Sequence, residues 1–185
     1  MALTESTMLE LGTIAPDFSL TDVLTGKTVC RDDFLGKKAI LVVFLCPHCP
    51  YVKHMELNLG ELCRMYAAKP LGIVAINSND VVSYPADNSV GMMEQAQANN
   101  FNFPYLLDDT QEVAKAFHAT CTPDVFIFNK EFKLVYRGEW DSSRPGNGIP
   151  VSGEDVRFSI DLTIGGHKVP DDQRAGIGCE IRWKP

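Results

Sequence analysis

An unbroken apolar run, followed at once by an amphipathic pattern, most constrains how this chain can fold. The run extends from Ala39 to Cys46 and shows no alternation with polar residues, which is typical of a strand buried on both faces of a sheet. Over residues 50–68, apolar residues then recur three and four positions apart, as on one face of a helix: Val52, Met55, Leu59, Leu62 and Tyr66. The sequence therefore predicts a buried strand that leads directly into a helix packed against the sheet.

The remainder of the chain alternates between strand patterns and helix patterns. Further strands are expected at residues 17–24, 27–31, 71–76, 103–107, 124–128 and 133–137, with the first two and the last two paired as hairpins. Further helices are expected at residues 89–99, 109–117 (with Asp109 as its N-cap) and 153–164. A strand, a helix and a strand in succession imply a parallel pair with a right-handed crossover, and the hairpins add antiparallel strands. We therefore expect an α/β sandwich with a mixed central sheet.

The length and the charge of the chain limit what it can do. A chain of 185 residues suffices for one domain with its own core, so we expect a single domain over residues 1–185 with an irregular C-terminal tail, 166–185, packed on it. The net charge of −7 argues against a nucleic-acid partner, which usually requires a basic surface. No apolar run approaches the roughly twenty residues of a membrane-spanning helix, and residues 1–11 lack the pattern of a secretory signal. We therefore expect a cytoplasmic protein without a membrane partner.

The motif Cys46-Pro47-His48-Cys49 lies where the predicted strand ends and the predicted helix begins. A helix N-terminus presents unpaired N–H groups and a partial positive charge, which favour a thiolate. The spacing allows Cys46 and Cys49 to form a disulfide after a small adjustment of the first turn. We expect Cys46, nearer to the strand end and to solvent, to be the nucleophile, and Cys49, one turn into the helix, to be the resolving thiol. Pro47 and His48 are expected to tune the reduction potential, because a protonated imidazole would stabilise the thiolate.

Three features of the sequence resemble the thioredoxin-like superfamily. They are the motif from Cys46 to Cys49 after the buried strand, Thr122-Pro123 directly before the strand at 124–128, and the phrase Gly12-Thr-Ile-Ala-Pro-Asp-Phe18. Over residues 11–184 the chain is also similar to a bacterial branch of redoxin proteins described as peroxiredoxin-like or thiol–disulfide isomerase-like. Phrases similar to that branch are Ala75-Ile-Asn-Ser-Asn-Asp80, Pro104-Tyr-Leu-Leu-Asp108, Cys121-Thr-Pro-Asp124, Tyr136-Arg-Gly138, Arg144-Pro-Gly-Asn147 and Gly178-Cys179.

The resemblance implies both a fold and an activity. The implied fold is a thioredoxin-like three-layer sandwich with an N-terminal β-hairpin extension. In that fold the bond before Pro123 is cis and faces the redox pair, and the main chain of Thr122 pairs with an extended substrate segment. The implied enzyme is a thiol–disulfide oxidoreductase that exchanges a Cys46–Cys49 disulfide with protein or small-molecule thiols. An upstream thiol reductant would reset the pair, and no bound cofactor is needed.

The remaining cysteines leave alternatives open. Cys121 directly precedes Thr122, so the implied fold brings it near Cys46. It is a candidate for an additional redox cysteine, for a metal ligand or for a small packed residue. Cys179 is a further candidate for a redox partner, although packing beneath the tail is the preferred interpretation. The segment 81–88 is expected to be a surface loop without a role in the chemistry.

Two other functions stay open. Thiolate and imidazole ligands suit zinc or copper(I), and a metal-binding protein on the same fold would use Cys46, His48, Cys49, His118 and Cys121. The second is an atypical thiol peroxidase. Peroxiredoxins carry a proline and a threonine before the peroxidatic cysteine, whereas the matching positions before Cys46 hold Ala39 and Val43. A peroxidatic site in this chain would therefore be noncanonical.

Overall fold

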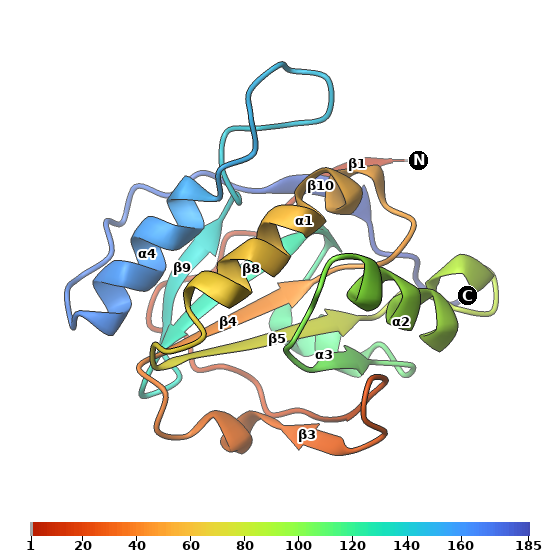
Figure 1. The fold of residues 1–185 in the computed structure, drawn as a ribbon, viewed down its shortest axis with the longest axis horizontal. Coiled ribbons are helices and arrows are strands. Elements are labelled where there is room, and N and C mark those ends of the chain that lie inside the picture. Colours follow the sequence, from red (N-terminus) through yellow and green to blue (C-terminus); the bar gives the residue numbers. More distant parts are fainter. Residues whose placement is uncertain (1) are drawn as a thin grey trace.

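A mixed sheet of seven strands lies at the centre of residues 2–185, the part of the chain that the computed structural model describes (Figure 1). Its order is β3-β2-β6-β5-β4-β8-β9, with the bounds Thr28–Cys30, Ser19–Asp22, Tyr105–Leu107, Leu71–Asn77, Ala39–Phe44, Asp124–Asn129 and Leu134–Gly138, respectively. β4, β5 and β6 run parallel to one another, whereas β2, β3, β8 and β9 pair antiparallel with their neighbours. The mixed central sheet and both hairpins predicted from the sequence are confirmed.

Helices cover both faces of this sheet. Within residues 2–185 they are Pro50–Met65 (α1), Ser89–Ala98 (α2), Glu112–Phe117 (α3) and Glu154–Ile164 (α4), with short 3₁₀ turns at Arg31–Phe34 (η1) and Pro85–Asp87 (η2). α1, α2 and α4 contribute to one apolar cluster, and α3 contributes to another on the opposite face. β4 turns Val43 toward the first cluster and Phe44 toward the second, which explains why its sequence is apolar without alternation. None of the described helices is long and apolar enough to cross a membrane.

A second, smaller sheet joins the two ends of the described chain to the segment before β8. It consists of Leu3–Glu5 (β1), Ile177–Glu180 (β10) and Cys121–Thr122 (β7) in the order β1-β10-β7, and both pairings are antiparallel. The prediction of an irregular tail is wrong in this respect, because β10 forms the centre of a sheet. A Cβ atom on Gly178 would lie 2.1 Å from the Thr122 carbonyl oxygen, so the absence of a side chain lets β10 run this close to β7.

The register of β4 and β8 decides what lies at the end of the buried strand. Phe44, the last residue of β4, is the antiparallel partner of Asp124, the first residue of β8. Continued outward, this register brings Cys46 toward Thr122. The Thr122–Pro123 peptide bond, which connects β7 to β8, is cis. The cysteine motif and the Thr-Pro pair, far apart in the sequence, therefore meet at one edge of the sheet.

One helix begins later than its sequence pattern predicts. α3 starts at Glu112 rather than at Asp109, and Gln111 precedes it in the left-handed conformation. The carboxylate that accepts from its first turn belongs to Asp108, which takes the Ala114 N–H at 2.9 Å. The capping role is therefore carried by the neighbouring, buried aspartate.

A buried ion pair lies beside the edge where β7 meets β8. Arg137 in β9 and Asp124 in β8 are both fully buried, and Arg137 Nη2 donates to Asp124 Oδ2 at 2.9 Å. The Ser6 hydroxyl donates to Asp124 Oδ1 at 2.6 Å, and the Thr120 amide donates to Oδ2 at 3.0 Å. The guanidinium also lies over the Phe126 ring, 3.9 Å from its centroid. Removal of either charge would leave the other buried without its partner, which is costly.

We expect Asp124→Ala to lower the free energy of unfolding by about 3–5 kcal/mol, because the buried Arg137 charge loses its partner. Asp171→Ala is the matched control, since Asp171 pairs with Lys168 where both side chains are mostly exposed. Such surface pairs contribute about 1 kcal/mol or less. Urea denaturation followed by circular dichroism measures both variants, and equal losses would contradict the prediction.

Candidate active site

Both cysteines of the motif lie at the junction of β4 and α1, as the sequence predicts. Cys46 follows closely after the end of β4, and Cys49 is the N-cap of α1, with Pro50 as the first helical residue. Proline suits this position because the N–H that it lacks would have no partner in the helix. Both cysteine side chains are 0% exposed. Cys46 is therefore buried where the sequence predicts contact with solvent, and Cys49 precedes the helix instead of lying one turn inside it.

The segment around the cis bond lies directly against both sulfurs. The Sγ of Cys46 is 3.5 Å from Thr122 Oγ1, and the Sγ of Cys49 is 3.1 Å from the Thr122 carbonyl oxygen. Thr122 itself is buried, and it is the antiparallel partner of Cys179 in the pairing of β7 with β10. The edge that the resemblance assigns to a substrate, at Thr122 and Pro123, is therefore held by the chain's own strand β10 in this structure.

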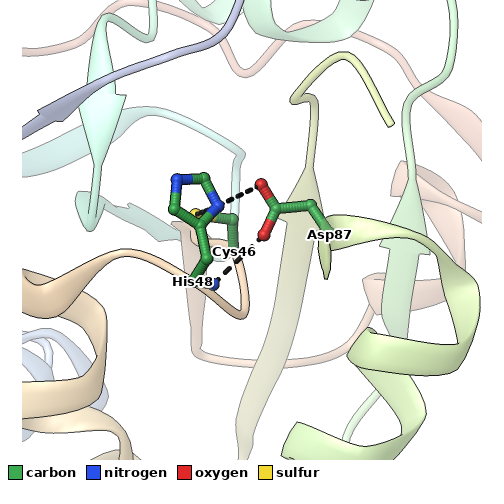
Figure 2. Close-up of side chains that lie close together, drawn as sticks. All are labelled: Cys46, His48 and Asp87. Carbon is green, nitrogen blue, oxygen red and sulfur yellow. Dashed lines mark hydrogen bonds and ion pairs between the residues drawn. The ribbon is translucent and has the colours of Figure 1, made fainter. Parts of the chain in front are cut away.

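A histidine and an aspartate complete the surroundings of Cys46 (Figure 2). His48 Nδ1 lies 2.5 Å from Asp87 Oδ2, and the His48 amide donates to Asp87 Oδ1 at 3.1 Å. The same ring nitrogen is 3.9 Å from Cys46 Sγ. Tyr84 stacks on the imidazole with the two rings nearly parallel. Asp87 thus holds the His48 ring beside the first cysteine of the motif.

Asp87 was missed by the sequence interpretation, which predicted a loop without chemistry at 81–88. It is fully buried, and Asn79 Nδ2 donates to its Oδ2 at 2.9 Å. β4 and β5 are parallel neighbours, so their carboxyl ends lie at the same edge of the sheet. The polar cluster Asn77–Asp80 at the end of β5 was the signal in the sequence, because it reaches the edge where β4 ends and its Asn79 contacts Asp87 there.

The candidate metal ligands predicted from the sequence are brought together only in part. Among residues 2–185, the one group of three or more whose ligand atoms all lie within 4.8 Å of one another is Cys46, His48 and Asp87. Cys46 and His48 belong to the predicted set, and Asp87 does not. Neither Cys49 nor His118 nor Cys121 joins that group.

The structure separates Cys121, for which several roles were left open, from Cys179, for which packing beneath the tail was preferred. The sulfur of Cys121 is buried 3.8 Å from Ser6 Oγ and 3.7 Å from the Pro123 carbonyl oxygen, and burial raises its pKa. The sulfur of Cys179 lies 2.8 Å from that of Cys49. The cysteine in contact with the motif is therefore the one in the tail.

Comparison with known protein families gives an independent result. The model of the AhpC/TSA family matches residues 11–137, which is more than half of the chain. This chain belongs to the AhpC/TSA family. Curated relatives named thiol-disulfide oxidoreductase ResA are distantly similar to this chain. The relative from Geobacillus kaustophilus is 28% identical over 137 residues, or 73% of this chain and 74% of the relative. The relative from Bacillus subtilis is 25% identical over 124 residues, or 67% and 64%.

Solved structures extend the likeness of this AhpC/TSA-family chain to residues that the family model leaves unmatched. An uncharacterized conserved protein from Geobacillus kaustophilus is 48% identical, with a TM-score of 0.97 over 100% of this chain and 98% of the other. A hypothetical protein from Sinorhizobium meliloti 1021 is 40% identical, with a TM-score of 0.95 over 98% of both chains. A putative thiol:disulfide interchange protein DsbE from Chlorobium tepidum, 19% identical with a TM-score of 0.65 over 85% and 100%, shares the fold. The predicted thioredoxin-like fold is confirmed.

The electrostatics of this AhpC/TSA-family site favour a thiolate at Cys49. Contact with the Cys46 thiol is the largest cause that lowers the pKa of Cys49, to about 5. The Cys179 thiol and the Val52 amide in the first turn of α1 lower it further, while burial opposes them. The pKa of Cys46 is raised by its contact with Cys49, by burial and by the charge of Asp87. In the resting dithiol the pKa shifts therefore favour the thiolate at Cys49 rather than at Cys46, the predicted nucleophile.

We expect the protein to retain a thiolate down to a pH of about 5, because Cys49 stays ionised above its lowered pKa. The ultraviolet absorbance of thiolates, measured against pH, follows this ionisation. Cys49→Ser should remove the transition. The control Cys63→Ser should keep it, since burial raises the pKa of Cys63. A first transition at the ordinary cysteine value of about 8.5 would contradict the assignment.

Proposed function

We propose that the protein is a thiol–disulfide oxidoreductase in which Cys46 and Cys49 alternate between a dithiol and a disulfide. The observation that supports this best is the position of both cysteines at the N-terminus of α1, where each sulfur lies against Thr122, the residue before the cis Thr122–Pro123 bond. Two sulfurs so placed can form and release a bond with little main-chain movement. The names of the ResA relatives agree with this proposal.

Cys46 is the sulfur that attacks the substrate in this proposal. It lies beside His48, whose side chain is 21% exposed, whereas Cys49 is enclosed by the Thr122 carbonyl and by Cys179. A movement of the His48 ring therefore opens a path to Cys46 before any path to Cys49. Because Asp87 holds that ring, it is a positioning residue for the opening.

The atoms and charges of the exchange balance when the Cys46–Cys49 pair starts with one proton. The Cys46 proton passes to the Cys49 thiolate that it contacts, and the Cys46 sulfur attacks a substrate disulfide R–S–S–R′. A mixed disulfide forms, and R′S⁻ leaves and takes the proton from Cys49. The Cys49 thiolate then attacks the Cys46 sulfur, which forms the Cys46–Cys49 disulfide and releases RS⁻. An external dithiol resets the pair by the reverse exchange.

The substrate of the proposed reaction is a disulfide or dithiol in a protein or a small molecule. A protein substrate that pairs with the main chain at Thr122 must take the place of β10, because β10 pairs there. A small disulfide needs an opening only at His48. The upstream thiol reductant and a cytoplasmic location stay predictions.

We expect Cys46→Ser and Cys49→Ser each to reduce the catalysed reduction of insulin by dithiothreitol to the uncatalysed rate, because a serine hydroxyl does not exchange with disulfides. The matched control is Cys30→Ser, since Cys30 lies in β3 and its thiol contacts Ser19 Oγ at 3.4 Å. The rate of insulin precipitation measures all three variants. Undiminished turnover in Cys46→Ser would exclude the proposed reaction.

Zinc binding is the second candidate, and the grouping of Cys46, His48 and Asp87 favours it. These residues offer sulfur, nitrogen and oxygen ligands of the kinds that zinc accepts. Elemental analysis of protein purified without chelator tests this function. Stoichiometric zinc together with protection of Cys46 from alkylation would favour metal binding, and metal-free protein with exchangeable thiols would favour the oxidoreductase. The atypical peroxidase stays a prediction.

A further inference from the structure

The tail strand β10 carries a third cysteine to the redox pair. Cys179 faces Thr122 in the register of β10 and β7, and its sulfur is 2.8 Å from that of Cys49. A disulfide has a sulfur separation of about 2.05 Å, so a shift on the order of 1 Å would join the two. The family model ends at residue 137, before β10 begins. Cys179 therefore lies outside the region that defines the family.

Cys49 is the cysteine within reach of both of the others. Its sulfur lies 2.8 Å from that of Cys179, and it shares contact with Thr122 with the sulfur of Cys46, three residues earlier in the chain. The three do not make up a group whose sulfurs all lie within 4.8 Å of one another, as ligands of a single ion would. This arrangement suits transfer of a disulfide from one pair to the other, because the Cys49 sulfur can bond to Cys46 or to Cys179.

We propose that Cys179 is a second resolving cysteine, which attacks the Cys49 sulfur of the Cys46–Cys49 disulfide, forms a Cys49–Cys179 disulfide and releases Cys46. This proposal rests on the function proposed above. One S–S bond breaks and one forms, so no external oxidant or reductant is consumed. The proton of the Cys179 thiol passes to the departing Cys46 sulfur. The step consumes the Cys179 thiol and releases the Cys46 thiol, so it places no net charge in the buried site.

The surroundings of Cys179 decide where its proton lies before this step. The pKa of Cys179 is raised to about 12 by burial and by its contacts with Cys49, so Cys179 waits as a thiol while Cys49 carries a thiolate. Formation of the Cys46–Cys49 disulfide removes that neighbouring charge. After the transfer, the freed Cys46 is again a thiol beside His48.

The close passage of β10 is what keeps Cys179 in reach. Gly178 lies against the Thr122 carbonyl, where a Cβ would be 2.1 Å from the oxygen. The Ile181 amide donates to the Thr120 carbonyl oxygen at 3.0 Å, which anchors the strand just beyond Cys179. β10 therefore presents its cysteine at the position where the resemblance places a substrate strand.

The test is a disulfide map of the whole chain after stepwise oxidation with diamide, acid quenching, alkylation and trypsin digestion. Ala39–Lys53 carries Cys46 and Cys49, and Ala175–Arg182 carries Cys179, so a Cys49–Cys179 bond links two different peptides. We expect that linked pair in the oxidised protein, with Cys46 alkylated. Cys46→Ser should form the same link. In Cys179→Ser the link should be lost, leaving a disulfide within Ala39–Lys53.

Two further variants separate the contribution of β10 from that of cysteine content. Cys121→Ser is the control on the neighbouring strand and should leave the link intact. Gly178→Ala keeps Cys179 but displaces β10, so the yield of the link should fall severalfold at equal oxidant. An unchanged yield would contradict the positioning role of β10.

The proposal is overturned if Ala175–Arg182 is recovered fully alkylated while Ala39–Lys53 holds a Cys46–Cys49 disulfide at every diamide concentration. In that result the insulin assay still reports exchange by the pair, so the function proposed above survives. If instead neither peptide contains a disulfide and insulin is not reduced, both proposals fail. The two failures are therefore distinguishable.

Discussion

The antiparallel pairing of β4 with β8 is the constraint on which the site depends. Phe44 faces Asp124 in that register, so the chain leaving β4 and the chain entering β8 meet at one edge of the sheet. Main-chain hydrogen bonds along the two strands thus hold Cys46 and Thr122 together. The buried pair of Asp124 and Arg137 lies at the same place, so the residues that stabilise the start of β8 also position the Thr-Pro segment.

Much of the frame could be predicted from the sequence because it follows from local patterns. The apolar residues of β4 report burial on both faces, and the periodicity of α1 reports its packing on the sheet. The junction between these two elements places Cys46 and Cys49 without knowledge of any other segment. The role of Thr122 and Pro123 beside the cysteines could be predicted only from the family resemblance, since a threonine before a proline indicates by itself only a turn.

The rest of the site depends on contacts between distant segments, which no local pattern reports. Asp87 reaches His48 because β5 lies parallel to β4, and this neighbour relation becomes visible only once the sheet is assembled. Cys179 reaches Cys49 through the pairing of a four-residue strand, β10, whose alternation resembled that of a packed tail. The burial of Cys46 has the same origin, because it depends on which segments close over the strand end.

β10 also adds residues to the site from outside the region that the family model matches. The matched region ends with β9, whereas the strand that covers the sulfurs comes after α4. A fragment trimmed to residues 11–137 would retain Cys46, Cys49 and the cis bond but would leave the main-chain edge of Thr122 bare. An unpaired edge of this kind is a template for foreign strands, so the fragment would be prone to self-association. By pairing with Thr122, the C-terminal segment thus protects this edge from the strands of other molecules as well as from solvent.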